Sequence, residues 1–308
     1  MSRSLSRPAT QFAWTVPTRH PGITGTAAVS RYEQIARGAD QAGFDALYLP
    51  WDDAGDSTLV VAGILARATR QTRIIVETHA GAGSPVYLAK LFATAQRAAS
   101  GRLDLALRAR APHEKALDER DAAARLVEFA RVFRGVWNEQ PVAQDDDTVR
   151  FDVDGRFFQV EAGGLRGILS GQRLPRLYRP ADQTGDATVY GTVITQRPTA
   201  GHALAVGILT RVSEAEARAD AAQTGVNDGI VGSHAQTIDA LAEAIGDGVT
   251  EIVFRAADPI ADLYRVAENV LPALDAGRRV GDAEATEPAD TRTDTEKDTD
   301  TEKEEAAA

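Results

Sequence analysis

The chain has 308 residues, of which 43% are hydrophobic and 26% are charged, so it can bury a substantial core and has an ordinary globular composition. It contains no cysteine, which excludes disulfides, thiolate metal ligands and a cysteine nucleophile. No apolar run approaches the roughly 20 residues of a membrane span, and no secretory signal opens the sequence. We therefore expect a soluble, cytoplasmic protein.

The net charge of −11 is concentrated at the carboxyl terminus. Residues 282–308 carry eleven acidic residues against three basic ones, so the rest of the chain is close to neutral and offers no basic footprint for nucleic acid. This segment also lacks aromatic and branched aliphatic residues, which predicts a disordered tail over 277–308. A docking tail for a basic partner is the alternative. Residues 1–10 are expected to be flexible, and 11–276 to form one domain.

The first half alternates strand and helix patterns. The expected strands are 11–16, 44–50, 72–78 and 102–108, and the expected helices are 30–43, 57–68, 84–98 and 118–137. Gly43 ends the first helix, Asp56 or Ser57 can cap the second, and Pro85 lies in the first turn of the third. Four strand–helix units in series predict a parallel sheet covered by helices, either a barrel or a doubly wound sheet.

The alternation falters in the second half. Residues 147–162 predict an antiparallel hairpin that turns at Asp154-Gly155, and 173–180 can form a fifth barrel strand. Strands are expected at 187–195 and 202–212, but only six residues separate them. Because a parallel crossover needs a dozen or more residues, this pair should form a hairpin or an abbreviated barrel segment.

The pattern recovers near the carboxyl terminus. Residues 234–248 predict a helix, 249–256 a strand and 258–274 a final helix. The side chains expected to pack this last helix are Ile260, Leu263, Tyr264 and Val270. The five histidines show no metal-ligand spacing, so we expect no metal site.

Three stretches in the same order carry a resemblance to a known family. Residues 32–50, 84–107 and 230–274 resemble, respectively, the first helix and second strand, the third helix through the fourth strand, and the last helix–strand–helix of the bacterial luciferase-like flavin-dependent monooxygenases. The similarity is greatest to the alkanesulfonate monooxygenases. It covers most of residues 11–274 and makes the chain a truncated, divergent member.

The resemblance implies a (β/α)8 barrel of the TIM type, abbreviated after its fifth and sixth strands. It also implies a reduced FMN at the carboxyl ends of the strands, supplied by a separate flavin reductase, with oxygen as co-substrate. A deazaflavin is another possible cofactor. Family members commonly dimerise through early barrel helices, here 57–68 and 84–98, so a homodimer or a heterodimer with an intact paralogue is expected.

Several family positions are replaced in this chain. No cysteine occurs at 50–55, the end of the fourth strand (106–110) lacks the family's asparagine and Thr-Gly turn, and Asp121 stands where a tyrosine is usual. Residues 179–182 (Arg-Pro-Ala-Asp) replace the Gly-Gly-Ser turn whose amides hold the FMN phosphate, and 203–207 offers neither arginine nor histidine. The expected active site is therefore degenerate, and no catalytic residue can be assigned.

Six residues remain as candidates near the barrel mouth. The candidates for contact with the cofactor are Trp14, His79, Arg108, Arg110 and Arg179, and the candidate for contact with the substrate is Trp51. The three arginines should converge on one rim, where their forked donors suit a phosphate or sulfonate. The alternatives are core packing for Trp14, an ordinary loop residue for His79, and an ordinary surface rich in arginine for the three arginines.

Two hypotheses follow. The first is an FMN-dependent oxidoreductase or monooxygenase of the luciferase-like type, impaired when alone. The second is a catalytically inactive paralogue that acts as a structural or heterodimer subunit, or that holds flavin without turnover.

Overall fold

The structure, a computed structural model, describes residues 10–274 apart from 24, 112, 138–150, 164–171, 182, 184–188, 225 and 227. The predicted tail, and the predicted flexible amino terminus except Thr10, lie outside the described residues. Eight parallel strands close into a barrel, which confirms the predicted fold class. In order around the ring they are β1 (Gln11–Thr15), β2 (Ala46–Leu49), β3 (Arg73–His79), β4 (Leu103–Arg108), β7 (Leu177–Arg179), β8 (Thr192–Thr195), β9 (Ala203–Arg211) and β11 (Glu251–Arg255).

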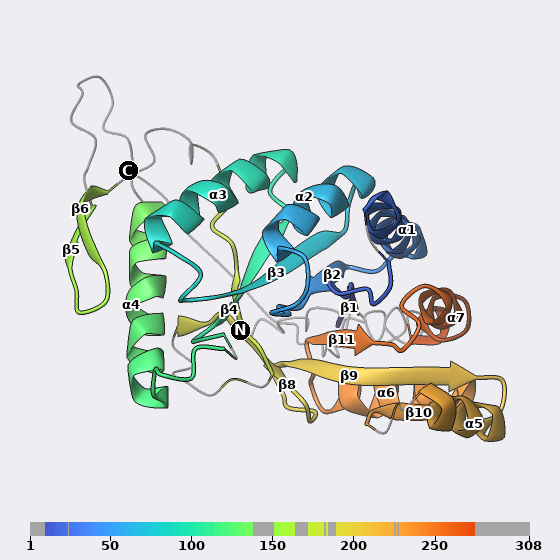
Figure 1. The fold of residues 1–308 in the computed structure, drawn as a ribbon. Coiled ribbons are helices and arrows are strands. Elements are labelled where there is room, and N and C mark those ends of the chain that lie inside the picture. Colours follow the sequence, from blue (N-terminus) through green and yellow to red (C-terminus); the bar gives the residue numbers. More distant parts are fainter. Residues whose placement is uncertain are drawn as a thin grey trace, which may run out of the picture.

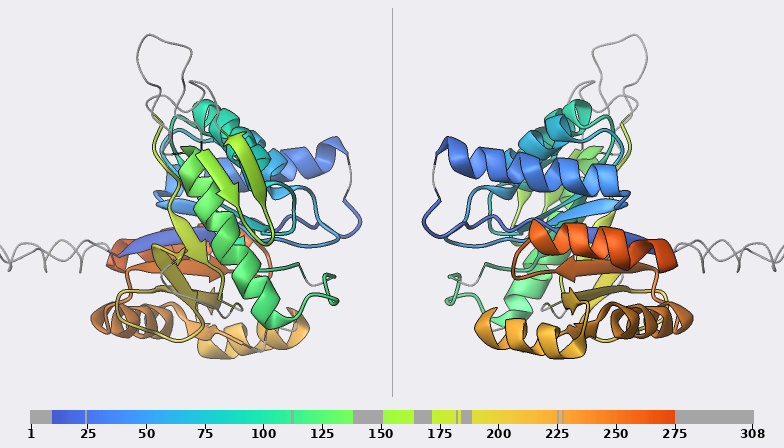
Figure 2. Two further views of the ribbon diagram at one scale, coloured as in Figure 1. Left: turned by 90° about the vertical axis from the view of Figure 1, so that its left-hand side faces the viewer. Right: turned by 90° about the vertical axis from the view of Figure 1, so that its right-hand side faces the viewer.

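Helices cover the outside of this ring (Figure 1). They are α1 (Thr26–Ala42), α2 (Thr58–Ala68), α3 (Pro85–Ala98), α4 (Glu119–Trp137), α5 (Glu214–Thr224), α6 (His234–Gly246) and α7 (Ala261–Asn269). Figure 2 shows α1 and α7 side by side although they stand near opposite ends of the chain, with Gly38 of α1 against Leu263 and Tyr264 of α7. None of the helices in the described ranges is long and apolar enough to cross a membrane.

The helix boundaries follow the predicted signals in part. The predicted stop at Gly43 is confirmed, because this residue takes a φ of 82° that disfavours a side chain, and Pro85 opens α3 as predicted. The predicted side-chain cap of α2 is wrong. Ser57 is the N-cap residue but makes no capping hydrogen bond, and the Asp56 carboxylate instead accepts a hydrogen bond from the Tyr32 hydroxyl at 2.8 Å.

The arc formed by β7, β8 and β9 is shortened. No α-helix occurs in the described part of the connection between β7 and β8, nor between β8 and β9. β8 and β9 are nevertheless parallel, paired only through Ile194↔Ala203 and Thr195↔Leu204. Because β9 begins at the level where β8 ends, the connecting residues return over almost none of the strand length, and no long crossover is needed. The hairpin alternative for this pair is therefore wrong, and the abbreviated barrel segment is right.

Three strands do not belong to the eight-stranded ring. The predicted hairpin is confirmed as β5 (Phe151–Asp154) and β6 (Gln159–Gly163), which lie beside α4 in Figure 1. The short strand β10 (Ile230–Ser233) pairs with the far end of β9. Neither β10 nor α5 was predicted, because α5 buries only two alanines, Ala217 and Ala221, and so has no apolar stripe to detect.

Alternate residues of each strand face the barrel interior or the helices. The interior contains one cluster of buried side chains, namely Ala13, Ala46, Tyr48, Ile75, Ala106, Tyr178, Ile194, Ala203 and Val253. Their neighbours along the strands, including Trp14, pack in the larger cluster under the helices. Tyr264, predicted to pack the last helix, is instead 41% exposed, while Leu263 beside it is fully buried.

Candidate functional site

The carboxyl ends of the barrel strands enclose a cavity of about 230 Å³, which we call the barrel-mouth cavity. Its polar lining consists of Thr15, Tyr48, Glu77, Arg108, Gln196 and Arg255. These side chains face inward because they continue the odd or even series of their strands toward the rim. The cavity thus lies at the end of the barrel where proteins of this fold class keep their sites.

A buried carboxylate lies in the wall of this cavity. Glu77 is 2% exposed, and its Oε2 accepts a hydrogen bond from the Tyr48 hydroxyl at 2.5 Å. Its Oε1 accepts a hydrogen bond from the Arg108 guanidinium, which forms an ion pair with it. The three side chains come from the adjacent strands β2, β3 and β4. The negative charge inside the barrel mouth is therefore neutralised by a cation from the next strand.

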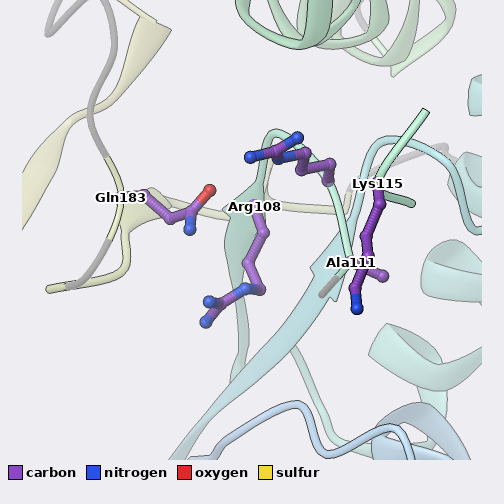
Figure 3. A pocket seen from close by; sticks show the side chains of 5 residues that line it. Arg108, Ala111, Lys115 and Gln183 are labelled. Carbon is purple, nitrogen blue, oxygen red and sulfur yellow. The ribbon is translucent and has the colours of Figure 1, made fainter. Parts of the chain in front are cut away.

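A second cavity of about 300 Å³, the cationic pocket, adjoins the first. It is lined by Arg108, Arg110, Ala111, Lys115 and Gln183, and Arg108 also lines the barrel-mouth cavity. Figure 3 shows Gln183 and Lys115 on opposite sides of Arg108. Three cationic side chains and a carboxamide, without a carboxylate in the lining, form a donor set that suits an anion such as a phosphate.

His79 lies at the end of β3 beside this pocket but lines neither cavity. Its ring is 4% exposed and contacts Trp51 edge to face, with 4.7 Å between ring centroids. Its Nδ1 lies 3.3 Å from Oε2 of Glu114 without a hydrogen bond. Burial lowers the pKa of His79, and the nearby Glu114 carboxylate opposes this effect only in part.

This lowered pKa predicts acid sensitivity. The unfolded chain binds a proton at His79 near the ordinary pKa of 6.5, whereas the folded protein binds it only at lower pH. The free energy of unfolding should therefore fall as the pH drops below about 6.5, and His79→Gln should remove part of that fall. Denaturant titrations of both proteins at about pH 8 and about pH 5 check this, and equal losses in the two would contradict it.

The structure brings together some of the predicted site residues. Arg108 and Arg110 share the cationic pocket, and Trp51 and His79 are in ring contact beside it. Arg179 does not join them: its neighbour Tyr178 faces the barrel interior, so Arg179 points to the other side of β7, where its charge lies near Tyr190. Asp182, predicted to put a carboxylate at the phosphate turn, lies outside the described residues.

Trp14 also lies away from both cavities. It is fully buried under the helices, packs against Phe44 and Phe254, and donates its indole N–H to the Pro259 carbonyl at 3.0 Å. The core-packing alternative for Trp14 is the one that this placement fits.

Sequence reasoning missed Glu77, Tyr48, Lys115 and Gln183. A signal for Glu77 was present, because Arg73, Glu77 and His79 share one face of an otherwise apolar strand. Charged residues on the interior face of a barrel strand are exceptional enough to mark a site or a structural ion pair. Gln183 gave no signal, because it belongs to a loop without periodicity.

A sequence model of the luciferase-like monooxygenases matches residues 10–185, which is more than half of the chain. The chain belongs to the luciferase-like monooxygenase family. The match spans the strands that contribute Tyr48, Glu77 and Arg108, as well as the segment that carries Arg110 and Lys115.

Solved structures of related fold cover nearly the whole barrel of this luciferase-like protein. EDTA monooxygenase from Chelativorans sp. BNC1 is 15% identical, with a TM-score of 0.71 over 88% of this chain and 94% of its own. A long-chain alkane monooxygenase is 12% identical, with a TM-score of 0.71 over 89% and 92%. A riboflavin lyase solved with modified FMN and riboflavin is 12% identical, with a TM-score of 0.69 over 87% and 92%. At these identities the likeness supports the fold alone.

Within the described ranges, no group of three or more histidine, aspartate or glutamate side chains is arranged to hold a metal ion.

Proposed function

We propose that this luciferase-like protein is an FMN-dependent oxidoreductase whose cationic pocket binds the phosphate of the cofactor. The observation that carries the proposal is the adjoining pair of cavities that share Arg108 at the carboxyl end of the barrel. FMN has an anionic phosphate at one end and a flat ring system at the other. The riboflavin lyase of similar fold was solved with a modified FMN, which adds support at the level of the fold.

The residues fit the phosphate end of such a cofactor. Arg108, Arg110 and Lys115 provide cationic donors, and Gln183 adds a carboxamide. The barrel-mouth cavity adds apolar walls from Ile194, Ala205 and Val253. When bound, reduced flavin supplies the electrons for oxygen activation, and a separate reductase would provide it. The chain's own share is to hold the phosphate, while Glu77 holds the hydroxyl proton of Tyr48 at the cavity wall.

Comparing FMN with riboflavin tests the phosphate contact, because the two ligands differ by the phosphate. We expect wild-type protein to bind FMN more tightly in calorimetry. Arg110→Leu or Lys115→Leu should each weaken FMN binding roughly 10-fold or more, since a hydrogen bond to a charged group contributes about 1.5–3 kcal/mol. Riboflavin binding should stay unchanged in both variants.

The control is Arg37→Leu, which removes an exposed arginine of α1 paired only with Glu33. It should leave FMN binding as in the wild type. Equal affinities of the wild type for FMN and riboflavin would contradict a phosphate contact in the cationic pocket.

A second candidate is the catalytically inactive paralogue, which either holds flavin without turnover or acts as a subunit. The size of the barrel-mouth cavity favours it: about 230 Å³ is below the roughly 300–1,000 Å³ of typical ligand pockets. Titration with anaerobically reduced FMN separates the two candidates. Saturable binding followed by oxidation of a supplied substrate supports the enzyme, binding without turnover supports the flavin holder, and the absence of binding supports the structural subunit.

We also propose that the protein forms a homodimer through α2 and α3. These neighbouring helices expose large apolar side chains, with Val60 68%, Tyr87 59% and Leu91 36% accessible. Exposed apolar patches mark interfaces when they are contiguous. Val60→Glu combined with Tyr87→Glu should convert a dimer to a monomer in sedimentation velocity, whereas Val127→Glu on α4 should not. A wild-type monomer would overturn the homodimer and leave a paralogous partner.

A further inference from the structure

The segment between β4 and α4 carries two of the three cations of the cationic pocket, Arg110 and Lys115. The third, Arg108, is the last residue of β4 and is fixed by its ion pair with Glu77. Arg110 and Lys115 carry like charges that face one cavity and repel each other, whereas the charge of Arg108 is offset by Glu77. A connecting segment without regular structure could relieve this repulsion by moving Arg110 and Lys115 apart. A contact within the segment, or between the segment and a neighbouring helix, is therefore needed to keep the two side chains at the cavity.

Glu114 provides this contact from inside the segment. Its Oε2 accepts a hydrogen bond from the Ala111 amide at 2.8 Å, which ties the segment to itself. Both oxygens also accept hydrogen bonds from Arg125 of α4, from Nη1 at 2.8 Å and from Nη2 at 3.0 Å. The same Nη2 also donates to the Ala109 carbonyl at 3.0 Å. Arg125 therefore holds the first residue of the segment together with Glu114.

Neither member of this pair lines the cationic pocket. Glu114 lies against Gly81, where an added Cβ would approach Oε1 to 2.2 Å. The hydrogen bonds from Arg125 are the largest cause of a Glu114 pKa lowered to about 2, so the carboxylate is ionised at neutral pH. The carboxylate that restrains the segment thus lies outside the lining of the cationic pocket, so it does not compete with a bound anion for Arg110 and Lys115.

We propose that the Glu114–Arg125 pair is a positioning clamp that pre-forms the cationic pocket for a phosphate monoester. This rests on the proposed function for the identity of the ligand, but the clamp acts on any phosphate. The pair sets the positions of Arg110 and Lys115 before the ligand arrives, so binding does not have to order the segment. Arg110 is restrained further by donating to the Leu117 carbonyl at 2.6 Å, within the same segment.

The test measures the affinities of inorganic phosphate, FMN and riboflavin by calorimetry in the wild type and in Glu114→Gln, Arg125→Leu and Arg125→Lys. Glu114→Gln and Arg125→Leu should weaken phosphate and FMN about 10-fold, because binding would then have to order the side chains of Arg110 and Lys115. Riboflavin affinity should not change. Arg125→Lys, which keeps the charge but loses the two-pronged contact, should retain more phosphate affinity than Arg125→Leu.

A combined variant distinguishes positioning from general structural support. If the clamp acts through the two cations, adding Glu114→Gln to Arg110→Leu and Lys115→Leu should weaken phosphate no further. The matched control is Asp121→Asn on α4, the helix that carries Arg125; it weakens a two-pronged pair with Arg156 of the β5–β6 turn and removes no contact of Glu114 or Arg125. That variant should bind phosphate like the wild type.

The outcomes separate this inference from the proposed function. Phosphate binding without preference for FMN over riboflavin would overturn the proposed function. The clamp would then be tested by the phosphate affinity of Glu114→Gln relative to that of the wild type. Wild-type affinity for phosphate in Glu114→Gln would overturn the clamp. So would a loss of stability that weakens all three ligands equally. A wild-type protein that binds neither phosphate nor FMN would overturn both.

Discussion

Replacing Asp104 with alanine is expected to destabilise the fold by about 3–5 kcal/mol, the usual cost of removing one partner from a buried ion pair. Asp104 is fully buried at the amino-terminal end of the barrel interior. Its oxygens accept hydrogen bonds from Arg73 and Arg173 at 2.8 Å each and from the Arg176 amide at 3.0 Å. The alanine variant would remove the acceptor that these three donors share and leave a cavity in its place, while Arg73 and Arg173 would keep only their other acceptors.

The surrounding network links Asp104 to the other charged groups at this end of the barrel interior. Arg73 also donates to Glu251 and Gln11 at 2.8 Å each, and the Tyr178 hydroxyl donates to the other Glu251 oxygen at 2.9 Å. Burial raises the pKa of Glu251 even though Arg73 opposes the shift. Without Asp104, one cation and one carboxylate remain under the interior layer of the barrel.

Denaturant unfolding of Asp104→Ala measures this effect, with Glu33→Ala as the control. Glu33 pairs with Arg37 on the surface of α1, where such a pair contributes at most about 1 kcal/mol. Asp104→Asn, which keeps the shape and one acceptor, should fall between the two. Equal losses in Asp104→Ala and Glu33→Ala would show that the network adds nothing beyond a surface contact.

The second large effect is expected at Trp14. Trp14→Ala should cost about 3–5 kcal/mol, because it removes a fully buried indole from between strands and helices. Trp14→Phe keeps most of the packing but leaves the Pro259 carbonyl without its donor, so it should cost roughly 1–3 kcal/mol. The placement outside both cavities predicts further that FMN affinity does not change in the phenylalanine variant.

The measurement pairs thermal or denaturant unfolding with FMN calorimetry on the same Trp14→Phe preparation. Trp51→Phe is the comparison, because its ring contacts His79 beside the cationic pocket and is partly exposed. A variant at Trp14 that loses FMN affinity while keeping wild-type stability would contradict the core role.

Sequence periodicity predicted the parallel sheet covered by helices, because strands and helices obey two clear repeats, and the resemblance to the family selected the barrel over a doubly wound sheet. The end of α1 at Gly43 and the start of α3 at Pro85 are marked by local chemical signals, so these two helix boundaries were predicted to within one residue. The junction between β8 and β9 could not be predicted, because the stagger of Ile194 against Ala203 is a property of the closed ring. Nothing local to either strand encodes it.

The candidate site was harder to predict than the fold. Arg108 and Arg110 were proposed because they follow a recognisable strand, and both line the cationic pocket. Arg179 was expected on the same rim, but it lies one step along β7 from the inward-facing Tyr178, and one step along a strand turns a side chain to the opposite face. Lys115 reaches the pocket from a segment whose conformation depends on Glu114, a tertiary contact that no spacing in the sequence reveals.

The number of paired residues differs between neighbouring strands of the ring, and this difference determines where the barrel should open locally. From β9 through β11 to β4 the strands share long registers, six residue pairs between β3 and β4 alone, whereas β4–β7, β7–β8 and β8–β9 share two pairs each. Partial opening follows the least connected boundary of a structure. The backbone amide hydrogens of β7 and β8 should therefore exchange with solvent through local separation of this arc. Those of β1 and β3 should exchange only when the whole domain unfolds.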